Sequence, residues 1–213
     1  MSQKIAVIDY GMGNLRSVSK AIEHVADDAE VRVTNDADWI ARADRVVFPG
    51  QGAARDCMAA IGGRHLNEAV LDAAQRKPFL GICMGLQVLM EWSEENGGTE
   101  LLGLFMGRVK RFDGLARDDR GLPLKIPHMG WSPVEQRREH PLWAGIPDHA
   151  RFYFVHSYRV VPEDPSLVAA TTDYGVRFTS AIARDNLFAC QFHPEKSAEM
   201  GLRLLKNFVE WRP

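Results

Sequence analysis

The sequence has few cysteines, almost no net charge and no long hydrophobic run. Its three cysteines, Cys57, Cys83 and Cys190, lie far apart and form no CxxC pair. This spacing argues against a disulfide framework and against a structural zinc site, and it is typical of a protein in a reducing cytosol. A net charge of −2 gives no reason to expect a surface for nucleic acid or for an anionic membrane.

The apolar runs are short, and the chain begins without a targeting pattern. The longest runs have the length of a strand, so the sequence offers no candidate for a membrane-spanning helix. Residues 1–9 lead from a short polar stretch into an expected strand, without the apolar core of a signal peptide. We therefore expect a cytoplasmic protein. With 213 residues, 46% of them hydrophobic, the chain can form one domain over residues 1–213 with a sizeable core.

The first half of the sequence alternates between apolar runs and helical patterns. Strands are expected at 4–9, 31–34 and 45–48, where short apolar runs are flanked by polar or charged residues. Helices are expected at 15–25, 36–43, 56–61 and 65–74. This alternation predicts βαβ units, and hence an α/β fold with a doubly wound, mostly parallel sheet flanked by helices.

The most informative stretch is residues 78–89, where an apolar run becomes a helical pattern. At its centre Gly81, Cys83 and Gly85 form a G-x-C-x-G, the nucleophile-elbow pattern with cysteine in place of serine. Glycines at both flanking positions suit a turn too sharp for side chains, which strains the central residue and presents its side chain. The dipole of the following helix would favour the thiolate form. The alternative is a buried core cysteine, the usual place of that residue type.

Beyond the elbow the pattern changes from helical to strand-like. The helix is expected to run to Glu95, with its apolar and acidic residues on opposite faces. After Gly97 and Gly98, short strands are expected at 107–112, 124–126, 131–134, 152–156 and 168–171, which predicts an additional small antiparallel sheet. The charged segment 117–121 is expected to form an exposed loop. A hairpin of 180–183 with 187–191, and a helix at 198–211, are expected to end the chain.

A candidate base for Cys83 lies near the end of the chain. His193 directly follows an apolar strand and precedes Pro194, which cannot continue a strand ladder. Glu195, two residues later, could hold the far ring nitrogen and fix the tautomer. An equally good reading of these residues alone is a histidine at a strand end beside a surface glutamate. Four other histidines lie in polar helices or loops and are expected to be solvated: His24, His65, His140 and His149.

Two glycines follow the third expected strand, in the segment Pro49-Gly50-Gln51-Gly52. They would allow a ligand to approach the backbone closely, or they form only a tight turn. Taken alone, the turn is the commoner explanation.

The elbow, the Pro-Gly-x-Gly segment and the late F-H-P-E, in this order, resemble class I (triad-type) glutamine amidotransferases over essentially the whole chain. The resemblance implies a flavodoxin-like glutaminase domain and a triad of Cys83, His193 and Glu195. Cys83 would attack the side-chain carboxamide of glutamine to give a thioester and ammonia, and water would then release glutamate. Thiolate, imidazole and backbone dipoles cover this chemistry, so no metal or organic cofactor is expected.

The same resemblance implies the groups that surround the nucleophile. The oxyanion would be held by the backbone N–H of Met84 and by the Gln51–Gly52 segment. In the narrower subfamily described in the next paragraph, valine commonly stands in place of Gln51, but a main-chain donor does not depend on the side chain. Glutamine would be bound by five residues: Gly52, Gln87, Glu95, Ser157 and Tyr158. For Gln87 and Glu95 the competing readings are helix amphipathicity and a solvated acidic face.

A narrower resemblance concerns the synthase that uses the ammonia. The segments IDYGMGNL (8–15), SEE (93–95), PHMGW (127–131) and YFVHSY (153–158) resemble those of the glutaminase subunits of imidazole glycerol phosphate synthases. This implies a heterodimer with a (β/α)₈ cyclase subunit, which would receive ammonia through a tunnel. The implied interface consists of Asp9, Tyr10, Met12, Asn14, His128, Met129 and Trp131, for which ordinary loop packing is the alternative.

Two other functions remain open from the sequence. The chain could serve a different synthase, or act as an elbow-type cysteine peptidase, although the segment 10–14 disfavours both. It could also be an inactive flavodoxin-like interaction module, which the presence of Cys83, His193 and Glu195 disfavours.

Overall fold

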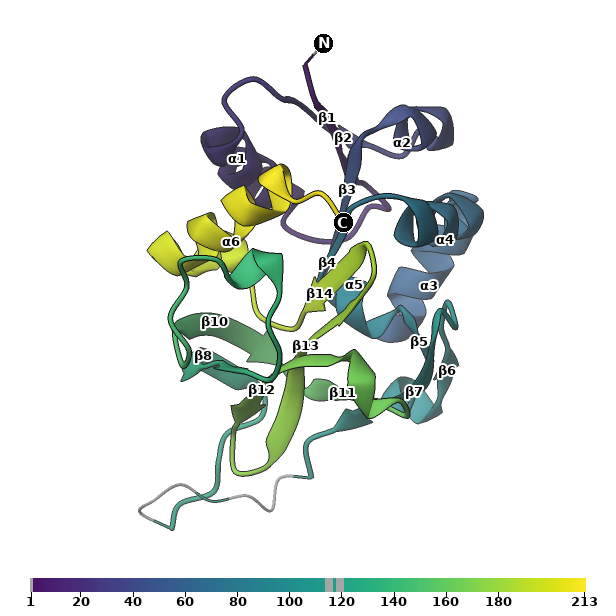
Figure 1. Ribbon diagram of the computed structural model, residues 1–213. Helices are drawn as coiled ribbons and strands as arrows, with labels where there is room; N and C mark the ends of the chain where they lie inside the picture. The colour runs from purple at the N-terminus through teal and green to yellow at the C-terminus, as the bar shows by residue number, and fades with distance from the viewer. Residues whose placement is uncertain (1, 114–116, 118–120) are drawn as a thin grey trace.

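The apolar runs of the first half form parallel strands at one end of the main sheet (Figure 1). The computed structural model describes residues 2–113, 117 and 121–213. In this part of the chain the main sheet has 12 strands, in the order β2-β1-β3-β4-β14-β13-β11-β7-β5-β6, with β12 joined to β13 and β9 joined to β12.

The strands of the main sheet are β1 Lys4–Ile8, β2 Glu30–Thr34, β3 Arg45–Gly50, β4 Phe79–Cys83, β5 Met90–Ser93, β6 Thr99–Glu100, β7 Phe105–Arg111, β9 Glu135–Gln136, β11 Tyr158–Pro162, β12 Val168–Asp173, β13 Arg177–Arg184 and β14 Leu187–Cys190. A second, two-stranded sheet is formed by β8 His128–Pro133 and β10 Arg151–His156. The helices are α1 Leu15–Val25, α2 Ala37–Arg42, α3 Ala54–Gly63, α4 Asn67–Arg76, α5 Met84–Gln87 and α6 Ala198–Glu210. The short 3₁₀ turns are η1 Glu95–Gly97, η2 Pro141–Trp143, η3 Pro165–Leu167 and η4 Pro194–Lys196.

The strands β2, β1, β3, β4 and β14 are parallel neighbours. Every residue of β3, β4 and β14 is buried, as expected for strands covered on both faces. Helices α1 and α6 cover one face of the sheet, and α2, α3 and α4 cover the other (Figure 1). The expected α/β fold, with a large sheet between helices, is confirmed.

Alternation along each strand divides the core between the two faces. On β1, Ile5 and Val7 join the cluster under α1 and α6, with Phe208 among its members. Ala6 and Ile8 join the cluster under α2, α3 and α4. Successive side chains of a strand point to opposite faces, so a fully apolar strand supplies both cores.

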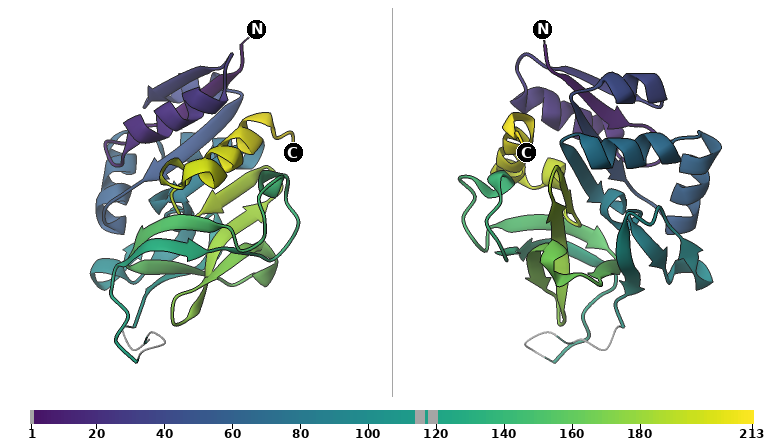
Figure 2. Two further views of the ribbon diagram at one scale, coloured as in Figure 1. Left: turned by 90° about the vertical axis from the view of Figure 1, so that its left-hand side faces the viewer. Right: turned by 45° about the vertical axis from the view of Figure 1, so that its right-hand side comes forward.

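The antiparallel strands of the second half extend the main sheet as well as forming a separate small one. β13 pairs antiparallel with β14, and β11 pairs antiparallel with both β13 and β7. The separate pair β8–β10 lies beside α6 (Figures 1 and 2). Its register sets His128 opposite His156. The expected small antiparallel sheet is therefore present, and antiparallel strands also continue the parallel one.

The predicted long helix after the elbow is wrong. Helix α5 ends at Gln87, and the residues from Met90 form strand β5. The carbonyl groups that would continue the helix are taken by amides from a later segment: Val88 O accepts from Leu102 N at 2.9 Å, and Leu89 O accepts from Phe105 N at 3.0 Å. Tertiary pairing with β7 overrides the helical pattern of the sequence.

Other expectations for the second half also need correction. Residues 124–126 lie in irregular chain instead of a strand, between Pro123 and Pro127, neither of which can donate to a ladder. The expected loop 117–121 lies partly outside the described residues. Arg117 itself is exposed, and its guanidinium donates to the Gly121 carbonyl at 2.9 Å.

One histidine prediction is wrong as well. His140 packs against Phe188 and Trp211, with ring centroids 5.0 Å from each, and burial lowers its pKa to about 4. The other three, His24, His65 and His149, are exposed as expected. Within the part of the chain that the structure describes, no helix is long and apolar enough to cross a membrane.

Candidate active site

Cys83 ends β4 and begins the turn into α5. Its backbone has φ 56° and ψ −107°, a conformation that costs roughly 1–3 kcal/mol for a residue with a side chain. The flanking glycines permit it, because a Cβ on Gly81 would lie 2.8 Å from the Ala189 Cβ, and one on Gly85 only 1.8 Å from the Phe48 carbonyl oxygen. The turn thus has the geometry that the G-x-C-x-G pattern predicts.

The elbow brings Cys83 to the carboxyl end of the parallel strands. β4 lies between β3 and β14, so that Gly50 is the register partner of Cys83 on one side and Cys190 pairs with Ile82 on the other. Chain segments that follow β3 and β14 therefore meet at the elbow. The first contains Gln51 and Gly52, and the second contains His193 and Glu195.

His193 and Glu195 form a buried pair. His193 Nδ1 lies 2.8 Å from Glu195 Oε1, and the two side chains are only 2% and 1% exposed. Because the carboxylate accepts, Nδ1 carries a proton and the opposite nitrogen, Nε2, faces outward from the pair. Nε2 is buried and makes no hydrogen bond of ordinary geometry to any described residue. Burial alone would lower the pKa of His193, but the nearby sulfur of Cys83 and the Glu195 carboxylate outweigh it and raise that pKa to about 10.

A second set of contacts fixes the loop that carries this pair. The His193 amide donates to the Tyr153 carbonyl on β10 at 2.9 Å. Ser197 Oγ accepts from the Tyr153 amide at 3.0 Å and donates to the His193 carbonyl at 2.6 Å. Contacts from Tyr153 and Ser197 therefore fix the backbone of His193, while Glu195 fixes its ring.

The segment 50–52, predicted to help hold the oxyanion, lies tightly against the N-terminal turn. A Cβ on Gly50 would lie 1.9 Å from the hydroxyl of Tyr10, and one on Gly52 would lie 2.6 Å from the Met12 Cε. Gly52 has φ +99°, which favours glycine. The Gln51 carbonyl oxygen accepts from the Cys57 thiol, with Sγ 3.4 Å away. Close packing therefore explains these glycines better than a simple turn.

A cavity of about 420 Å³ opens over the elbow. It brings together the elbow at Cys83, the loop that carries His193 and the segment 51–52. The five predicted glutamine-binding residues also line it. Its lining consists of Gln51, Gly52, Cys83, Met84, Gln87, Glu95, Pro127, Val155, His156, Ser157, Tyr158, His193 and Lys196. Glu195 lies behind His193 and outside this lining, as an orienting carboxylate would.

The predicted glutamine-binding residues differ in how firmly they are held. Glu95 Oε2 accepts from the Ala54 amide at the start of α3, at 2.7 Å, so its carboxylate is fixed at the cavity wall instead of lying on a solvated face. Gln87 is 3% exposed, and its Nε2 donates to the Tyr158 carbonyl at 3.2 Å and to Gln191 Oε1 at 3.0 Å. Both amide hydrogens of Gln87 are thereby used.

The predicted interface residues fall into three groups by their exposure. Met129 and Trp131 are exposed, at 62% and 42%, on strand β8. Asp9, Met12 and Asn14 are half-buried, and Asn14 also caps α1 by accepting from the Ser17 amide.

Tyr10 and His128 form the third group of predicted interface residues, because both side chains are buried. Tyr10 is 0% exposed, and burial raises the pKa of its hydroxyl, which lies 3.9 Å from Cys57 Sγ. His128 is 1% exposed and stacks on Phe154 and Tyr174. Their side chains pack beneath the predicted interface and are not themselves part of the exposed surface.

Two further polar side chains belong to the site and were not predicted. Gln191 is fully buried, and its Nε2 donates to Cys83 Sγ at 3.6 Å. His156 is 6% exposed, and its Nδ1 donates to the Tyr158 carbonyl at 2.8 Å. The signal for Gln191 was a polar residue between the apolar residues Cys190 and Phe192, which is unusual for a buried strand end.

Similar proteins match this chain over all or nearly all of its length. The family described as "Glutamine amidotransferase class-I" matches residues 6–211. A protein of Thiobacillus denitrificans named imidazole glycerol phosphate synthase subunit HisH is 63% identical and covers 100% of this chain and 93% of its own. One of the same name from Aromatoleum aromaticum is 60% identical, covering 98% and 99%.

Solved structures agree on the fold. The structure of PurLQS from Thermotoga maritima has a TM-score of 0.73 at 17% identity, covering 99% of each chain. Another, described as a glutamine amidotransferase, has a TM-score of 0.70 at 15% identity and covers 97% of each. At such identities the likeness concerns the fold alone. The family match over nearly the whole length and the relatives at about 60% identity lead to one conclusion: the chain belongs to the class I glutamine amidotransferase family.

Proposed function

We propose that this protein is the glutaminase subunit of an imidazole glycerol phosphate synthase, with Cys83, His193 and Glu195 as its catalytic triad. The observation that carries the proposal is the strained Cys83 beside a buried His193–Glu195 pair at one cavity, in a chain whose relatives bear that subunit's name.

The reaction begins at the Cys83 sulfur. The thiolate attacks the side-chain carboxamide carbon of glutamine, and the carbonyl becomes an oxyanion. His193 donates a proton to the amide nitrogen, the C–N bond breaks, and ammonia leaves a thioester behind. A water molecule then attacks the thioester while His193 accepts its proton. The C–S bond breaks, and glutamate and the starting enzyme result, so that glutamine and water give glutamate and ammonia.

The surrounding groups assist this sequence in distinct ways. Glu195 keeps the proton of His193 on Nδ1, which leaves Nε2 for the reacting groups. The Met84 N–H and a main-chain donor from Gln51 or Gly52 stabilise the oxyanion, each worth typically ~2.7–4 kcal/mol. Gly52, Gln87, Glu95, Ser157 and Tyr158 bind glutamine, and Glu95 attracts its ammonium group. This chemistry requires neither a metal nor an organic cofactor.

The ammonia passes to a partner chain. We infer a heterodimer with a (β/α)₈ cyclase subunit, and the interface includes Asp9, Tyr10, Met12, Asn14, His128, Met129 and Trp131. The exposed Met129 and Trp131 support this assignment, because large apolar side chains on a surface strand suit a protein contact. Tyr10 and His128 contribute by holding the backbone in place.

The complex would convert a phosphoribulosyl-formimino aminoimidazole carboxamide nucleotide into imidazole glycerol phosphate and aminoimidazole carboxamide ribotide, in histidine biosynthesis. A cytoplasmic location and a single amidotransferase domain over residues 1–213 fit this role. The resting contact between the Gln51 carbonyl and Cys57 suggests that the partner's ligand adjusts the oxyanion segment, so the isolated chain turns over glutamine slowly.

The decisive experiment separates the two sources of ammonia. In the complex with the cyclase, Cys83→Ala abolishes synthesis from glutamine and leaves synthesis from added ammonia intact. Cys190→Ala is the control, since this buried cysteine has no part in the reaction, and it retains both activities. Loss of both activities in Cys83→Ala would show that Cys83 is not confined to the glutaminase step.

A further inference from the structure

We propose that Gln191 is a positioning residue for the nucleophile, an inference that rests on the proposed function. Gln191 follows β14, is 0% exposed, and precedes the segment that carries His193. Its Nε2 lies 3.6 Å from Cys83 Sγ, within the range of a hydrogen bond to sulfur. A fully buried carboxamide beside a candidate thiolate needs a physical explanation, because burying an amide without partners is unfavourable.

The orientation of this amide is determined by one main-chain carbonyl. The oxygen of Tyr158 can only accept, so the Gln87 atom 3.2 Å from it must be the donor Nε2. The same Nε2 lies 3.0 Å from Gln191, which must therefore present its acceptor, Oε1. The other end of the Gln191 carboxamide, the donor Nε2, then necessarily faces the sulfur. A flipped amide would set two acceptors or two donors against each other.

The Tyr158 carbonyl also accepts a hydrogen bond from one member of a histidine pair, His156 and His128. His156 Nδ1 donates to it at 2.8 Å, so His156 Nε2 accepts, and the atom 3.0 Å away, His128 Nδ1, donates. His128 Nε2, 2.8 Å from Ser132 Oγ, then accepts from the hydroxyl. Every proton in this branch has one position while both rings are neutral. Burial keeps them so, since it lowers the pKa of His128 to about 4 and that of His156 to about 3.

Gln191 thus stands at the end of a chain of hydrogen bonds in which each donor and each acceptor has only one assignment. It places a donor against the sulfur from the side of β14, while His193 approaches from the loop beyond it. A donor stabilises charge on sulfur and restricts the Cys83 side chain to one orientation. Glutamine suits this position because one end of its amide accepts from Gln87 while the other donates to Cys83.

The test measures the sulfur directly, without requiring turnover. Cys83 is the cysteine that lines the cavity, whereas Cys57 and Cys190 are 0% exposed, so iodoacetamide modification of the folded protein reports Cys83. We expect Gln191→Met to lower the rate of alkylation at pH 7 about tenfold, since a hydrogen bond to a charged group is lost. In the complex with the cyclase, kcat for glutamine should fall by a similar factor with little change in KM. Gln75→Met, at an exposed position of α4, is the matched control and should change neither rate.

Two further measurements keep the outcomes distinct. Co-elution with the cyclase and a wild-type circular dichroism spectrum show that the variant is folded and docked, and ammonia-dependent synthesis at the wild-type rate shows that the cyclase step is unaffected. If Gln191→Met fails to fold, Gln191→Asn provides the same test, because the shorter amide cannot reach Gln87 and Cys83 together, and its alkylation rate should fall as well.

An alkylation rate equal to wild type in a folded variant would overturn the proposal, and so would a raised KM with unchanged kcat. If wild type shows no glutaminase activity with its partner but Gln191→Met still slows alkylation, the positioning role stands and the proposed function fails.

Discussion

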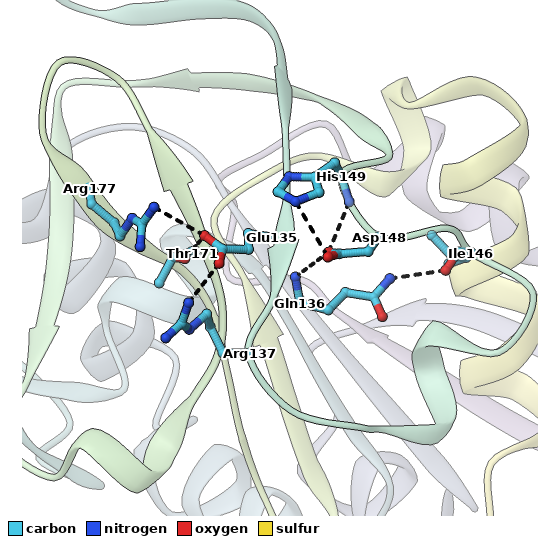
Figure 3. Close-up of polar contacts among 8 residues, drawn as sticks. All are labelled: Glu135, Gln136, Arg137, Ile146, Asp148, His149, Thr171 and Arg177. Atoms are coloured by element: carbon cyan, nitrogen blue, oxygen red, sulfur yellow. Dashed lines mark hydrogen bonds and ion pairs between the residues drawn. The ribbon is translucent and has the colours of Figure 1, made fainter.

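Two groups of polar contacts in this molecule each centre on a glutamate with basic partners, one at the surface and one buried. On the outside of the sheet, Glu135 lies between Arg137 and Arg177, with N–O distances of 2.7 and 3.4 Å (Figure 3). At the elbow, Glu195 lies 2.8 Å from His193. The carboxylate of Glu135 is 27% exposed and its arginine partners are 46% and 60% exposed, whereas both side chains of the elbow pair are almost completely buried.

The surroundings decide what each contact can do. Around Glu135 water competes for every donor, the arginines can move, and the pKa of Glu135 is lowered mainly by its hydrogen bond to Arg137. Next to it, Asp148 accepts from the amides of Gln136 and His149, at 2.8 and 2.9 Å, which orders a turn (Figure 3). At the elbow the His193–Glu195 pair is almost completely shielded from solvent, so each neighbour fixes the position of a proton. Contacts of similar length therefore order a surface turn around Glu135 but control proton positions around His193.

The sharpest way to break this comparison is to remove a histidine from each region. We expect His193→Gln to reduce glutamine turnover by the complex about 10³–10⁴-fold, because both proton transfers lose their carrier. His149→Gln removes the exposed histidine beside Asp148 and should leave turnover unchanged (Figure 3). The measurement is glutamate production in the presence of the cyclase and its ligand. A turnover within tenfold of wild type for His193→Gln would mean that another group carries the proton.

The second test removes the charge of Glu195. Gln at position 195 can still accept from His193 Nδ1, but it cannot stabilise an imidazolium with a full charge, so we expect glutamine turnover to fall about 100-fold. The raised pKa of His193 depends in part on this carboxylate, so the alkaline limb of the pH–rate profile should move to lower pH. Glu199→Gln, on the exposed first turn of α6, is the control. An unchanged profile with reduced turnover would point to a packing role instead.

Sequence patterns predicted the parts of this molecule that depend on local chemistry. The G-x-C-x-G at Cys83 implies its own backbone geometry, and the apolar runs of β1, β3 and β4 can pack only inside a sheet covered on both faces. The strand β5 could not be predicted, because amides from Leu102 and Phe105 decide that the helix stops. Gln191 was missed for a similar reason, since its role depends on partners 104 and 108 residues away. Local signals identify motifs, and long-range contacts determine how they are held.

A third test uses acid, which acts on buried histidines. His128 and His156 have pKa values lowered by burial to about 4 and about 3, whereas in the unfolded chain a histidine titrates near pH ~6.5. Below pH ~6.5 the unfolded state therefore binds more protons than the folded one, and stability falls as the pH drops towards 4. Each such histidine contributes a slope of about 1.4 kcal/mol per pH unit.

Urea unfolding between pH 7.5 and 5 measures this slope. His128→Phe, which keeps an aromatic ring between Phe154 and Tyr174, should make the slope shallower, even if it lowers stability at pH 7.5. The exposed His149→Gln should keep the slope of wild type. A His128→Phe slope as steep as that of wild type would show that acid acts on other groups.

The smallest effect on stability is expected at Glu135, although this carboxylate has more partners than Glu195. Glu135→Gln removes the charge between Arg137 and Arg177 and weakens the contact with Thr171, whose hydroxyl lies 3.4 Å from Oε2 (Figure 3). Because the group is on the surface, water and salt already screen its ion pairs, and the urea midpoint should change little. Raising the salt concentration should make even that small difference disappear, whereas salt should not restore the activity of Glu195→Gln. A large, salt-independent loss of stability in Glu135→Gln would mean that β9 depends on this carboxylate as firmly as His193 depends on Glu195. The two carboxylates would then contribute similarly to stability, and the two regions would differ only in their role in the reaction.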